Sequence, residues 1–267
     1  MGRTGEWDTE GHDLPDIRLP GNQDALVTRV LEANPNTVVV LQTGGPVEMP
    51  WIDAAPAILQ AWYGGQETGN AIADILFGAS EPGGRLAQTF PVRHEDAPAM
   101  SGDPVVYPGA DGKVEYREGT FIGYRHYDKS GIAPLFPFGF GLGYTQFDLS
   151  DASVVQDDLA SGGTATVAVK VTNIGAREGQ VVVQLYVGGA AGHREKELKA
   201  FAKLSLKPGK NAEAKLVLSP RDFAHFDVAG RCWRIAAGQY DIRVGQSSAD
   251  LGKPMSVTFS EAMTLAV

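Results

Sequence analysis

Apolar and polar positions follow different patterns in the two halves of this 267-residue chain. In the first half, short apolar runs alternate with stretches of helical spacing. The run NTVVVLQTG (36–44) is rich in β-branched residues and ends in glycine, which is typical of a buried parallel strand. The stretch QETGNAIADILFG (66–78) has apolar residues at helical spacing before Gly78, which predicts a helix that ends there.

Two further segments complete the α/β order of this half. MPWIDAAPAILQAWYGG (49–65) predicts a helix-like segment followed by a second apolar run, and GRLAQTF (84–90) predicts another short strand. This order indicates a mostly parallel sheet flanked by helices. Such sheets typically hold five or six strands, yet only about three are visible and nothing strand-like precedes 36–44. We therefore expect the sheet to lack its leading strands.

The second half shows period-2 alternation punctuated by glycine, proline, asparagine and serine. This pattern predicts an antiparallel β-sandwich of about seven strands. The clearest runs are TATVAVKVTNIG (164–175), GQVVVQLYVGG (179–189), ELKAFAKLSLKPG (197–209), AEAKLVLSP (212–220) and GQYDIRVGQSS (238–248). Tyr240 opens the last of these runs, either as the anchor of a chain corner through its hydroxyl or as a plain core residue.

A segment rich in aromatic residues and glycine connects the halves. It is too apolar for a loose linker, and we expect an ordered strap whose rings bury between the two domains. Its glycines at 139, 141 and 143 lack the spacing and the following helix of a dinucleotide-binding fingerprint. The predicted organisation is thus an α/β domain at 1–114, the strap at 115–145 and a β-sandwich at 146–267.

Charge and composition narrow the function classes. The net charge of −9 argues against a nucleic-acid partner, since such binding needs clustered Lys and Arg. The most basic stretch, HREKELKAFAKLSLKPGK (193–210), is interpreted as a solvated strand face. No apolar run is long enough to span a membrane, and the polar N-terminus predicts no signal peptide. The compartment stays open, because cytoplasmic, periplasmic and secreted parent proteins all fit.

Neither cofactor nor metal is predicted. The single Cys232 excludes an internal disulfide and any multi-cysteine zinc site, and its strand-like context favours a small buried residue over a nucleophile. The five histidines show no metal-ligand spacing. Glu67 is expected to help start the helix in 66–78, because a helix N-terminus favours a carboxylate.

The opening stretch concentrates like charges beside an aromatic ring. Its carboxylates surround Trp7 and are, in order, Glu6, Asp8, Glu10, Asp13 and Asp16. From the residues alone, a solvated acidic loop explains this cluster. A carboxylic acid placed among other carboxylates and beside an apolar ring also has its pKa raised, as a general acid requires.

Four stretches together resemble the C-terminal part of family 3 glycoside hydrolases, the β-glucosidase and β-xylosidase group. They are GEWDTEGHD (5–13), AWYGGQETGNAIADILFGASEPGGRLAQTFP (61–91), the strap from YREGTFIGYRHYD to PLFPFGFGLGYTQF (116–147), and the second-half runs beginning at VTNIG (171–248). The resemblance implies part of an α/β sandwich domain followed by a fibronectin type III-like domain. The family's TIM-like barrel, which supplies the nucleophilic aspartate, has no counterpart in these residues.

The resemblance assigns roles to the opening stretch. By motif position Glu10 matches the family's general acid/base, with Gly11 allowing the backbone to bend and Glu6 as the rival carboxylate. Trp7 is a candidate for stacking on a sugar, or else a loop tryptophan packed on its own domain. His12 is a candidate substrate-binding residue. The chain departs from the family at Leu14, where the family usually has arginine, and at Gly143, where it usually has serine.

Three functions follow as expectations. The first is the C-terminal portion of a retaining β-glycosidase that hydrolyses terminal β-linked sugars, with a β-glucoside or related oligosaccharide as substrate and a barrel domain or chain supplying the nucleophile. The second is a non-catalytic carbohydrate- or protein-binding module. The third is an inactive remnant, whose unpaired sheet edge favours a homo-oligomer.

Overall fold

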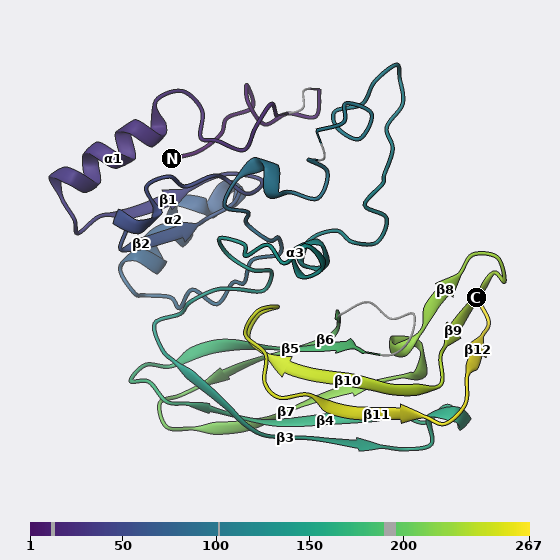
Figure 1. Ribbon diagram of the computed structural model, residues 1–267. Coiled ribbons are helices and arrows are strands. Elements are labelled where there is room, and N and C mark those ends of the chain that lie inside the picture. Colours follow the sequence, from purple (N-terminus) through teal and green to yellow (C-terminus); the bar gives the residue numbers. More distant parts are fainter. Residues whose placement is uncertain (12–13, 101, 190–195) are drawn as a thin grey trace. The chain divides into compact units, whose positions relative to one another are not determined.

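The computed structural model describes residues 1–11, 14–100, 102–189 and 196–267, and its chain forms two compact units (Figure 1). Unit 1 comprises Met1–Ser80 and Gln88–Phe136. Unit 2 comprises Glu81–Ala87 and Pro137–Val267. The chain therefore enters unit 2 briefly, returns to unit 1, and then completes unit 2.

Unit 1 combines helices with a parallel sheet. Its elements are α1 (Gln23–Ala33), β1 (Val38–Leu41), β2 (Ala57–Gln60), α2 (Thr68–Leu76) and α3 (Tyr124–Ser130), with single 3-10 turns at Ile52–Ala54, Gly65–Glu67 and His94–Asp96. The predicted helix in 66–78 is confirmed as α2, and Gly78 follows it with a φ of 74°.

The parallel sheet consists of β1 and β2, with one isolated bridge beside them. The two strands pair in register from Val38 opposite Ala57 to Leu41 opposite Gln60. On the other side of β1, Gly2 forms a parallel bridge with Gln42, and the Gln42 amide donates to the Met1 carbonyl at 2.9 Å. Gly2 makes only an isolated bridge, and β1 is the first strand in the described part of the chain, so the expectation that nothing strand-like precedes 36–44 is confirmed.

Two expectations for this half were wrong. The helix-like segment in 49–65 is only the 3-10 turn Ile52–Ala54, because Pro56 lacks an amide proton and disfavours helical backbone in the residue before it. The segment 84–90 is no strand: the chain bends at Ala87 and Gln88, where it passes from unit 2 to unit 1. Phe90 keeps one isolated bridge, to Phe136.

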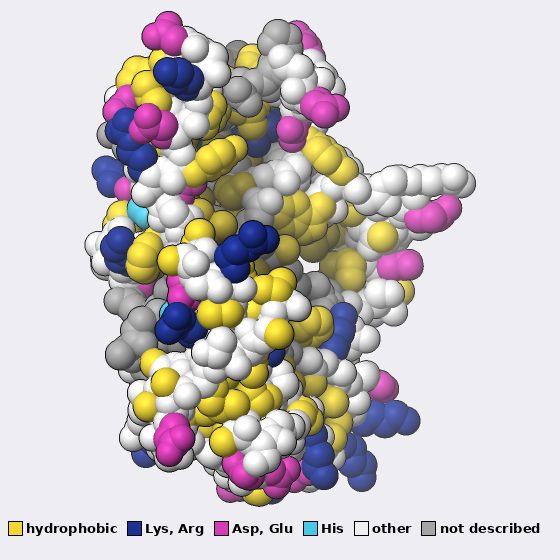
Figure 2. Space-filling model, turned by 90° about the vertical axis from the view of Figure 1, so that its right-hand side faces the viewer, with side chains coloured by type: hydrophobic (Ala, Val, Ile, Leu, Met, Phe, Trp, Pro, Cys, Tyr) yellow, Lys and Arg dark blue, Asp and Glu magenta, His cyan; other side chains and the backbone are white. Residues whose placement is uncertain are grey.

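Unit 1 leaves much apolar surface uncovered. Its buried apolar residues are Leu19, Val27, Leu31, Val39, Leu41, Val47, Met49, Trp51, Phe90, Val106 and Tyr127. By contrast α2, all of whose residues the structure describes, has no buried side chain. Exposed apolar side chains in or beside α1, β1 and α2 are Leu26, Val30, Val38, Leu76 and Phe77, the last being 90% exposed. Hydrophobic side chains reach the surface among charged ones on the face shown in Figure 2.

Unit 2 is an antiparallel sandwich with an added small sheet. One sheet has the order β11-β10-β5-β6, the second β3-β4-β7 and the third β12-β9-β8. The strands are β3 (Phe147–Gln156), β4 (Ala165–Asn173), β5 (Gly179–Gly188), β6 (Glu197–Leu206), β7 (Asn211–Leu218), β8 (His225–Asp227), β9 (Cys232–Ile235), β10 (Gly238–Gly245), β11 (Met255–Phe259) and β12 (Met263–Leu265). The two larger sheets together hold seven strands in the described part of the chain, as predicted.

Alternation along the strands builds the core of unit 2. In β4, for example, Val167, Val169 and Val171 are buried and the residues between them are not. The sequence did not single out β3, because a bulge between Ser150 and Ser153 breaks its alternation. The exposed side chains of β6 include Lys203 and agree with a solvated face, while residues 193–195 of the basic stretch lie outside the described residues.

The segment Glu81–Ala87 is fastened to the sandwich by polar contacts. Arg85 Nη2 donates to the Gln180 carbonyl at 3.3 Å, and the Glu81 carboxylate accepts from the Tyr144 amide at 3.2 Å. Buried Gln184 donates to the carbonyl of Gly139 at 3.1 Å. Gly139 has a φ of 80°, and a Cβ there would collide with the Gln184 amide, so this glycine is required for the strap to approach the sheet.

None of the helices in the described part of the chain has both the length and the apolar character needed to cross a membrane.

Tyr240 anchors a corner of the sandwich. Its side chain is fully buried, its ring packs edge-on against Phe223 and Phe259, and its hydroxyl donates to the carbonyl of Ala236 at 3.1 Å. Of the two interpretations offered by the sequence, the corner anchor fits this contact.

Replacing Tyr240 tests how much that hydrogen bond contributes to the free energy of unfolding. We expect Tyr240→Phe to lower the free energy of unfolding by about 1 kcal/mol, because the Ala236 carbonyl loses its donor. Tyr240→Ala should cost roughly 3–5 kcal/mol through the cavity it leaves. Urea denaturation followed by circular dichroism measures both, with Tyr116→Phe at an 80% exposed position as the control. If Tyr240→Phe had the same free energy of unfolding as wild type, the corner role would be contradicted.

Asp96 gives unit 1 a pH-dependent contribution to stability. This buried carboxylate accepts from Arg93 Nη2 at 2.7 Å, and that hydrogen bond lowers the pKa of Asp96 below its usual value. A lowered folded-state pKa stabilises the fold above the unfolded pKa of about 4, and this stabilisation disappears as the pH falls.

We therefore expect wild type to exceed Asp96→Asn in stability at pH 7 and to lose this advantage below about pH 4. Thermal unfolding across pH 2.5–7 measures the difference, and Asp53→Asn, at an exposed position, serves as the control. A difference that stays constant over the whole range would show that the carboxylate charge is not the cause.

Candidate functional site

Three chain segments meet at the carboxyl ends of the parallel sheet of unit 1. Residues 1–3 lead into the acidic stretch, which we call the acid loop (residues 5–16). β1 leads to Gly44, and β2 leads to Tyr63. Because parallel strands end at the same edge of a sheet, residues far apart in sequence come together there, and this edge is the usual position of ligand sites in α/β proteins.

Asp8 fixes the first half of the acid loop to this edge. Its Oδ2 accepts from the Tyr63 hydroxyl at 2.8 Å and from the Gly44 amide at 3.3 Å. Its own amide donates to the Thr4 carbonyl at 2.9 Å, as does the amide of Trp7. A Cβ on Gly44 would lie 3.0 Å from both Asp8 and Tyr63, so glycine permits this close approach. Asp8 is thus a structural carboxylate.

Backbone strain next to Tyr63 helps to direct its side chain. Trp62 has a φ of 54°, which is unfavourable for a bulky residue and costs of order 1–3 kcal/mol. Its ring packs edge-on against Phe90 at a centroid distance of 6.1 Å. Partial burial and the hydrogen bond to Asp8 raise the pKa of Tyr63, so its hydroxyl remains a proton donor at neutral pH.

A second tyrosine holds the other half of the loop. The hydroxyl of Tyr107 donates to the Leu14 carbonyl at 2.9 Å, across 93 positions of sequence. Asp16 Oδ1 accepts from the Arg18 amide at 2.8 Å, and Arg18 Nε pairs with Glu48 at 3.3 Å. Sequence reasoning missed both tyrosines, because no local pattern marks a residue that acts on a loop so distant in the chain.

Glu10 lies between the two anchored parts of the loop. It is exposed, and in the described part of the chain its side chain makes no hydrogen bond or ion pair. Glu6 is exposed as well, so exposure alone does not separate these two candidates. His12 and Asp13 lie outside the described residues. In the described part of the chain, the Glu10 carboxylate is therefore exposed and unpaired on the acid loop.

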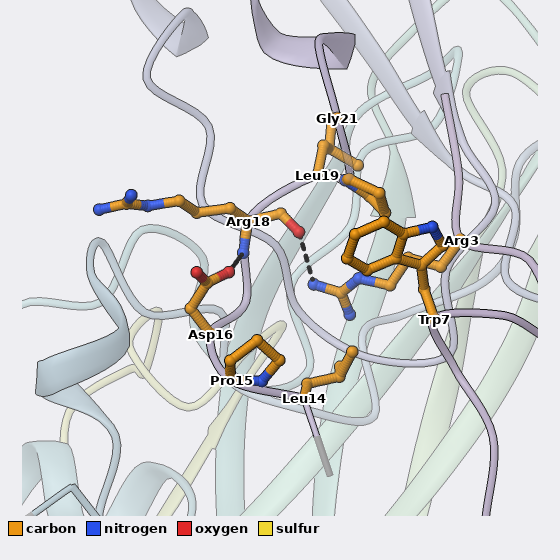
Figure 3. A pocket seen from close by; sticks show the side chains of 9 residues that line it. Arg3, Trp7, Leu14, Pro15, Asp16, Arg18, Leu19 and Gly21 are labelled. Atoms are coloured by element: carbon orange, nitrogen blue, oxygen red, sulfur yellow. Dashed lines mark hydrogen bonds between the residues drawn. The ribbon is translucent and has the colours of Figure 1, made fainter. Parts of the chain in front are cut away.

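Trp7 borders a cavity of about 180 Å³ beside the acid loop (Figure 3). The tryptophan is 44% exposed. The lining residues are Arg3, Trp7, Leu14, Pro15, Asp16, Arg18, Leu19, Pro20 and Gly21. Trp7 thus combines an accessible ring with a hollow next to it, an arrangement that suits stacking on a small ligand.

The other residues singled out by the sequence lie elsewhere. Glu67 stands directly before α2, as expected, and its Oε2 accepts from the Asn70 side chain at 2.6 Å. Cys232 is a half-buried free cysteine in β9. Within residues 1–11, 14–100, 102–189 and 196–267, no cluster of three or more His, Cys, Asp or Glu side chains is placed to hold a metal ion.

Comparison with known proteins identifies the class to which this arrangement belongs. Residues 1–144 match the model of the glycosyl hydrolase family 3 C-terminal domain, and residues 181–248 match that of a fibronectin type III-like domain. The first match covers more than half of the chain, so the chain belongs to glycosyl hydrolase family 3. The resemblance seen in the sequence is confirmed.

The relatives are β-glucosidases. A β-glucosidase of Rhizobium radiobacter is 54% identical over 260 residues, which are 96% of this chain and 32% of that protein. Thermostable β-glucosidase B of Acetivibrio thermocellus is 43% identical over 97% of this chain and 34% of its own length. A Streptomyces venezuelae β-glucosidase crystallised with D-glucose has a TM-score of 0.88 at 42% identity, over 93% of this chain and 32% of that one. The chain thus spans about a third of these relatives, as their C-terminal portion.

The contrast between Asp8 and Glu10 yields a direct test. We expect Asp8→Ala to lower the free energy of unfolding by roughly 1–3 kcal/mol, because the Tyr63 hydroxyl and the Gly44 amide lose their acceptor. Glu10→Gln should change it by less than about 0.5 kcal/mol, since Glu10 makes no polar contact that the substitution removes. Denaturant titration of the three proteins measures the difference, and equal effects of the two substitutions would contradict the assigned roles.

Proposed function

We propose that the chain is the C-terminal portion of a retaining β-glucosidase and that Glu10 is its general acid/base. The observation that carries the proposal is the arrangement of the acid loop. Among the described residues, Glu10 is exposed and unpaired between the parts of the loop that Tyr63 and Tyr107 anchor, at the carboxyl edge of a parallel sheet, where α/β proteins usually bind ligands. The family membership and the names of the relatives support the reaction class.

The chemistry needs Glu10 to act twice. In a retaining glycosidase the acid/base first protonates the leaving oxygen, while a second carboxylate about 5–5.5 Å away attacks the anomeric carbon and forms a covalent glycosyl-enzyme. The same residue then deprotonates the water that hydrolyses this intermediate. Glu10 makes no hydrogen bond or ion pair among the described residues, so its carboxyl group is open first to the leaving oxygen and then to the water.

The nucleophile belongs to a part of the protein outside these residues. The relatives are about three times as long as this chain, and their remaining two thirds would include the barrel that the family resemblance implies. The exposed apolar side chains of unit 1, among them Leu76 and Phe77 beside α2, are suited to contact such additional structure. The substrate class is a terminal β-glucoside or a related oligosaccharide.

Trp7 and His12 complete the proposed substrate contacts. The accessible face of Trp7 would stack on the sugar at the leaving-group side, because aromatic faces suit the apolar face of a pyranose. His12 follows Glu10 by two positions and is proposed as a substrate-binding residue from the resemblance alone.

A chimera tests the proposal. This chain would replace the corresponding C-terminal third of the Rhizobium radiobacter β-glucosidase. We expect the isolated chain to have negligible turnover on aryl β-glucosides and the chimera to hydrolyse them. In the chimera, Glu10→Gln should lower kcat/KM by at least about 100-fold for substrates with poor leaving groups, and much less for those with good ones, because only poor leaving groups need the proton.

The matched control is Glu6→Gln, which should leave the leaving-group dependence unchanged. If Glu6→Gln produced the steep dependence instead, the acid/base would be Glu6. Substantial hydrolysis by the pure 267-residue chain would contradict the division of labour between this chain and the remainder of the enzyme.

A further inference from the structure

A segment far along the chain reaches back to the acid loop. We call it the arm (residues 103–117), and it is part of the long teal loop in Figure 1. The hydroxyl of Tyr107 donates to the Leu14 carbonyl at 2.9 Å, so the arm holds the later half of the acid loop. Val106, the residue before this tyrosine, is buried. The arm can therefore fix the acid loop only as firmly as its own conformation is fixed.

Asp103 organises the turn that carries Tyr107. Its Oδ1 accepts from the Val105 amide at 3.0 Å, and its backbone carbonyl accepts from the amides of Val106 at 2.9 Å and Tyr107 at 3.3 Å. A carboxylate that accepts from the amide two residues later forms an Asx turn. The hydrogen bonds from the Val105 amide and from Arg117 lower the pKa of Asp103, so its carboxylate is ionised at neutral pH.

Arg117 joins this turn to the other side of the arm. Its Nη1 donates to Asp103 Oδ2 at 2.6 Å, and its Nε and Nη2 contact Glu115 Oε2 at 2.7 and 2.6 Å. The Glu115 amide in turn donates to the Val105 carbonyl at 2.9 Å. All three guanidinium nitrogens thus bind carboxylates, one from each side of the arm. An isolated surface ion pair contributes little, but a forked arginine between two carboxylates fixes a specific geometry.

The far end of the arm is closed in a different way. Ala110 and Lys113 exchange both backbone hydrogen bonds, at 3.0 and 2.9 Å. Between them Asp111 and Gly112 have φ values of 52° and 72°, and positive φ at both central residues is the requirement of a type I′ hairpin turn. The far end is therefore held by backbone contacts, whereas the base of the arm also uses the side chain of Arg117.

We propose that Arg117 is a positioning residue of the acid loop, which acts by fixing the turn from which Tyr107 binds the Leu14 carbonyl. Arg117 touches no reacting atom. Because Glu10 lies between this attachment and the earlier one, loosening the arm changes where Glu10 projects. The catalytic consequence alone rests on the proposed function. The hydrogen bond between Tyr107 and Leu14 can be measured in this chain by itself.

Carbon-detected NMR of the 267-residue chain reports this hydrogen bond directly. Carbonyl-labelled leucine combined with nitrogen-labelled proline selects the Leu–Pro bonds, and the sequence has them at 14–15 and 19–20. Tyr107→Phe should move the Leu14 signal, because its carbonyl loses a donor, and leave the Leu19 signal in place. In Arg117→Met, which keeps an unbranched side chain and removes its charge, we expect the Leu14 signal to move most of the way to its position in Tyr107→Phe.

Arg93→Met is the matched control, because Arg93 is an exposed arginine that pairs with Asp96 at 2.7 Å in the same unit. Its Leu14 signal should match wild type. Asp103→Asn keeps a side-chain acceptor and removes the charge that binds Arg117, so it should reproduce the shift and decides the matter if Arg117→Met does not fold. An unmoved Leu14 signal in the folded variants, or an equal shift in the control, overturns the proposal. Failure of both variants to fold also overturns it, because a positioning residue is dispensable for folding.

The chimera tests the catalytic consequence. There Arg117→Met should lower kcat by roughly tenfold, since misplacing a reacting group by about 1 Å costs up to about 100-fold. The loss should be larger for poor leaving groups than for good ones, as for Glu10→Gln. Tyr107→Phe should have the same effect, and the double variant should be no worse than either single one, because both act through one hydrogen bond.

Additive effects of Arg117→Met and Tyr107→Phe, or a loss that is equal for all leaving groups, would contradict the positioning role. An inactive chimera that carries the unaltered chain would count against the proposed function instead. The NMR result would still decide whether Arg117 fixes the contact between Tyr107 and Leu14.

Discussion

The attachment of the acid loop to the carboxyl edge of the parallel sheet is the constraint on which the site depends. Three parallel segments bring Asp8, Gly44 and Tyr63 together, although 55 positions separate Asp8 from Tyr63. Tyr107 then fixes the later part of the loop. Because these contacts bind the flanks and leave Glu10 free, the loop has a defined path and an available carboxylate.

The two units contribute in different ways. Unit 2 has a closed core with fully buried residues such as Tyr240 and Val183. The segment Glu81–Ala87 is hydrogen-bonded to this unit. Unit 1 holds the site and carries exposed apolar side chains on α1, β1 and α2. A domain that exposes such apolar surface is suited to function as part of a larger protein. This agrees with a chain that spans about a third of its relatives.

The sequence was sufficient where structure follows from local periodicity. The alternation of Val167, Val169 and Val171 predicted β4, and helical spacing before Gly78 predicted α2. It failed where a local feature breaks the pattern, as Pro56 does for the expected helix and the bulge in β3 does for that strand. Glu10 and Trp7 became candidate site residues from a motif. Tyr63 and Tyr107 act on the loop through tertiary contacts, which no sequence pattern encodes.

The central claim concerns where Glu10 projects, and a crystal structure of the chimera with bound glucose measures this most directly. The account predicts that the carboxyl group of Glu10 lies about 5–5.5 Å from a carboxylate supplied by the rest of the enzyme, across the anomeric carbon of the sugar. A structure in which Glu10 points away from the sugar, with another carboxylate of the loop or of the remaining enzyme in that place, would contradict it.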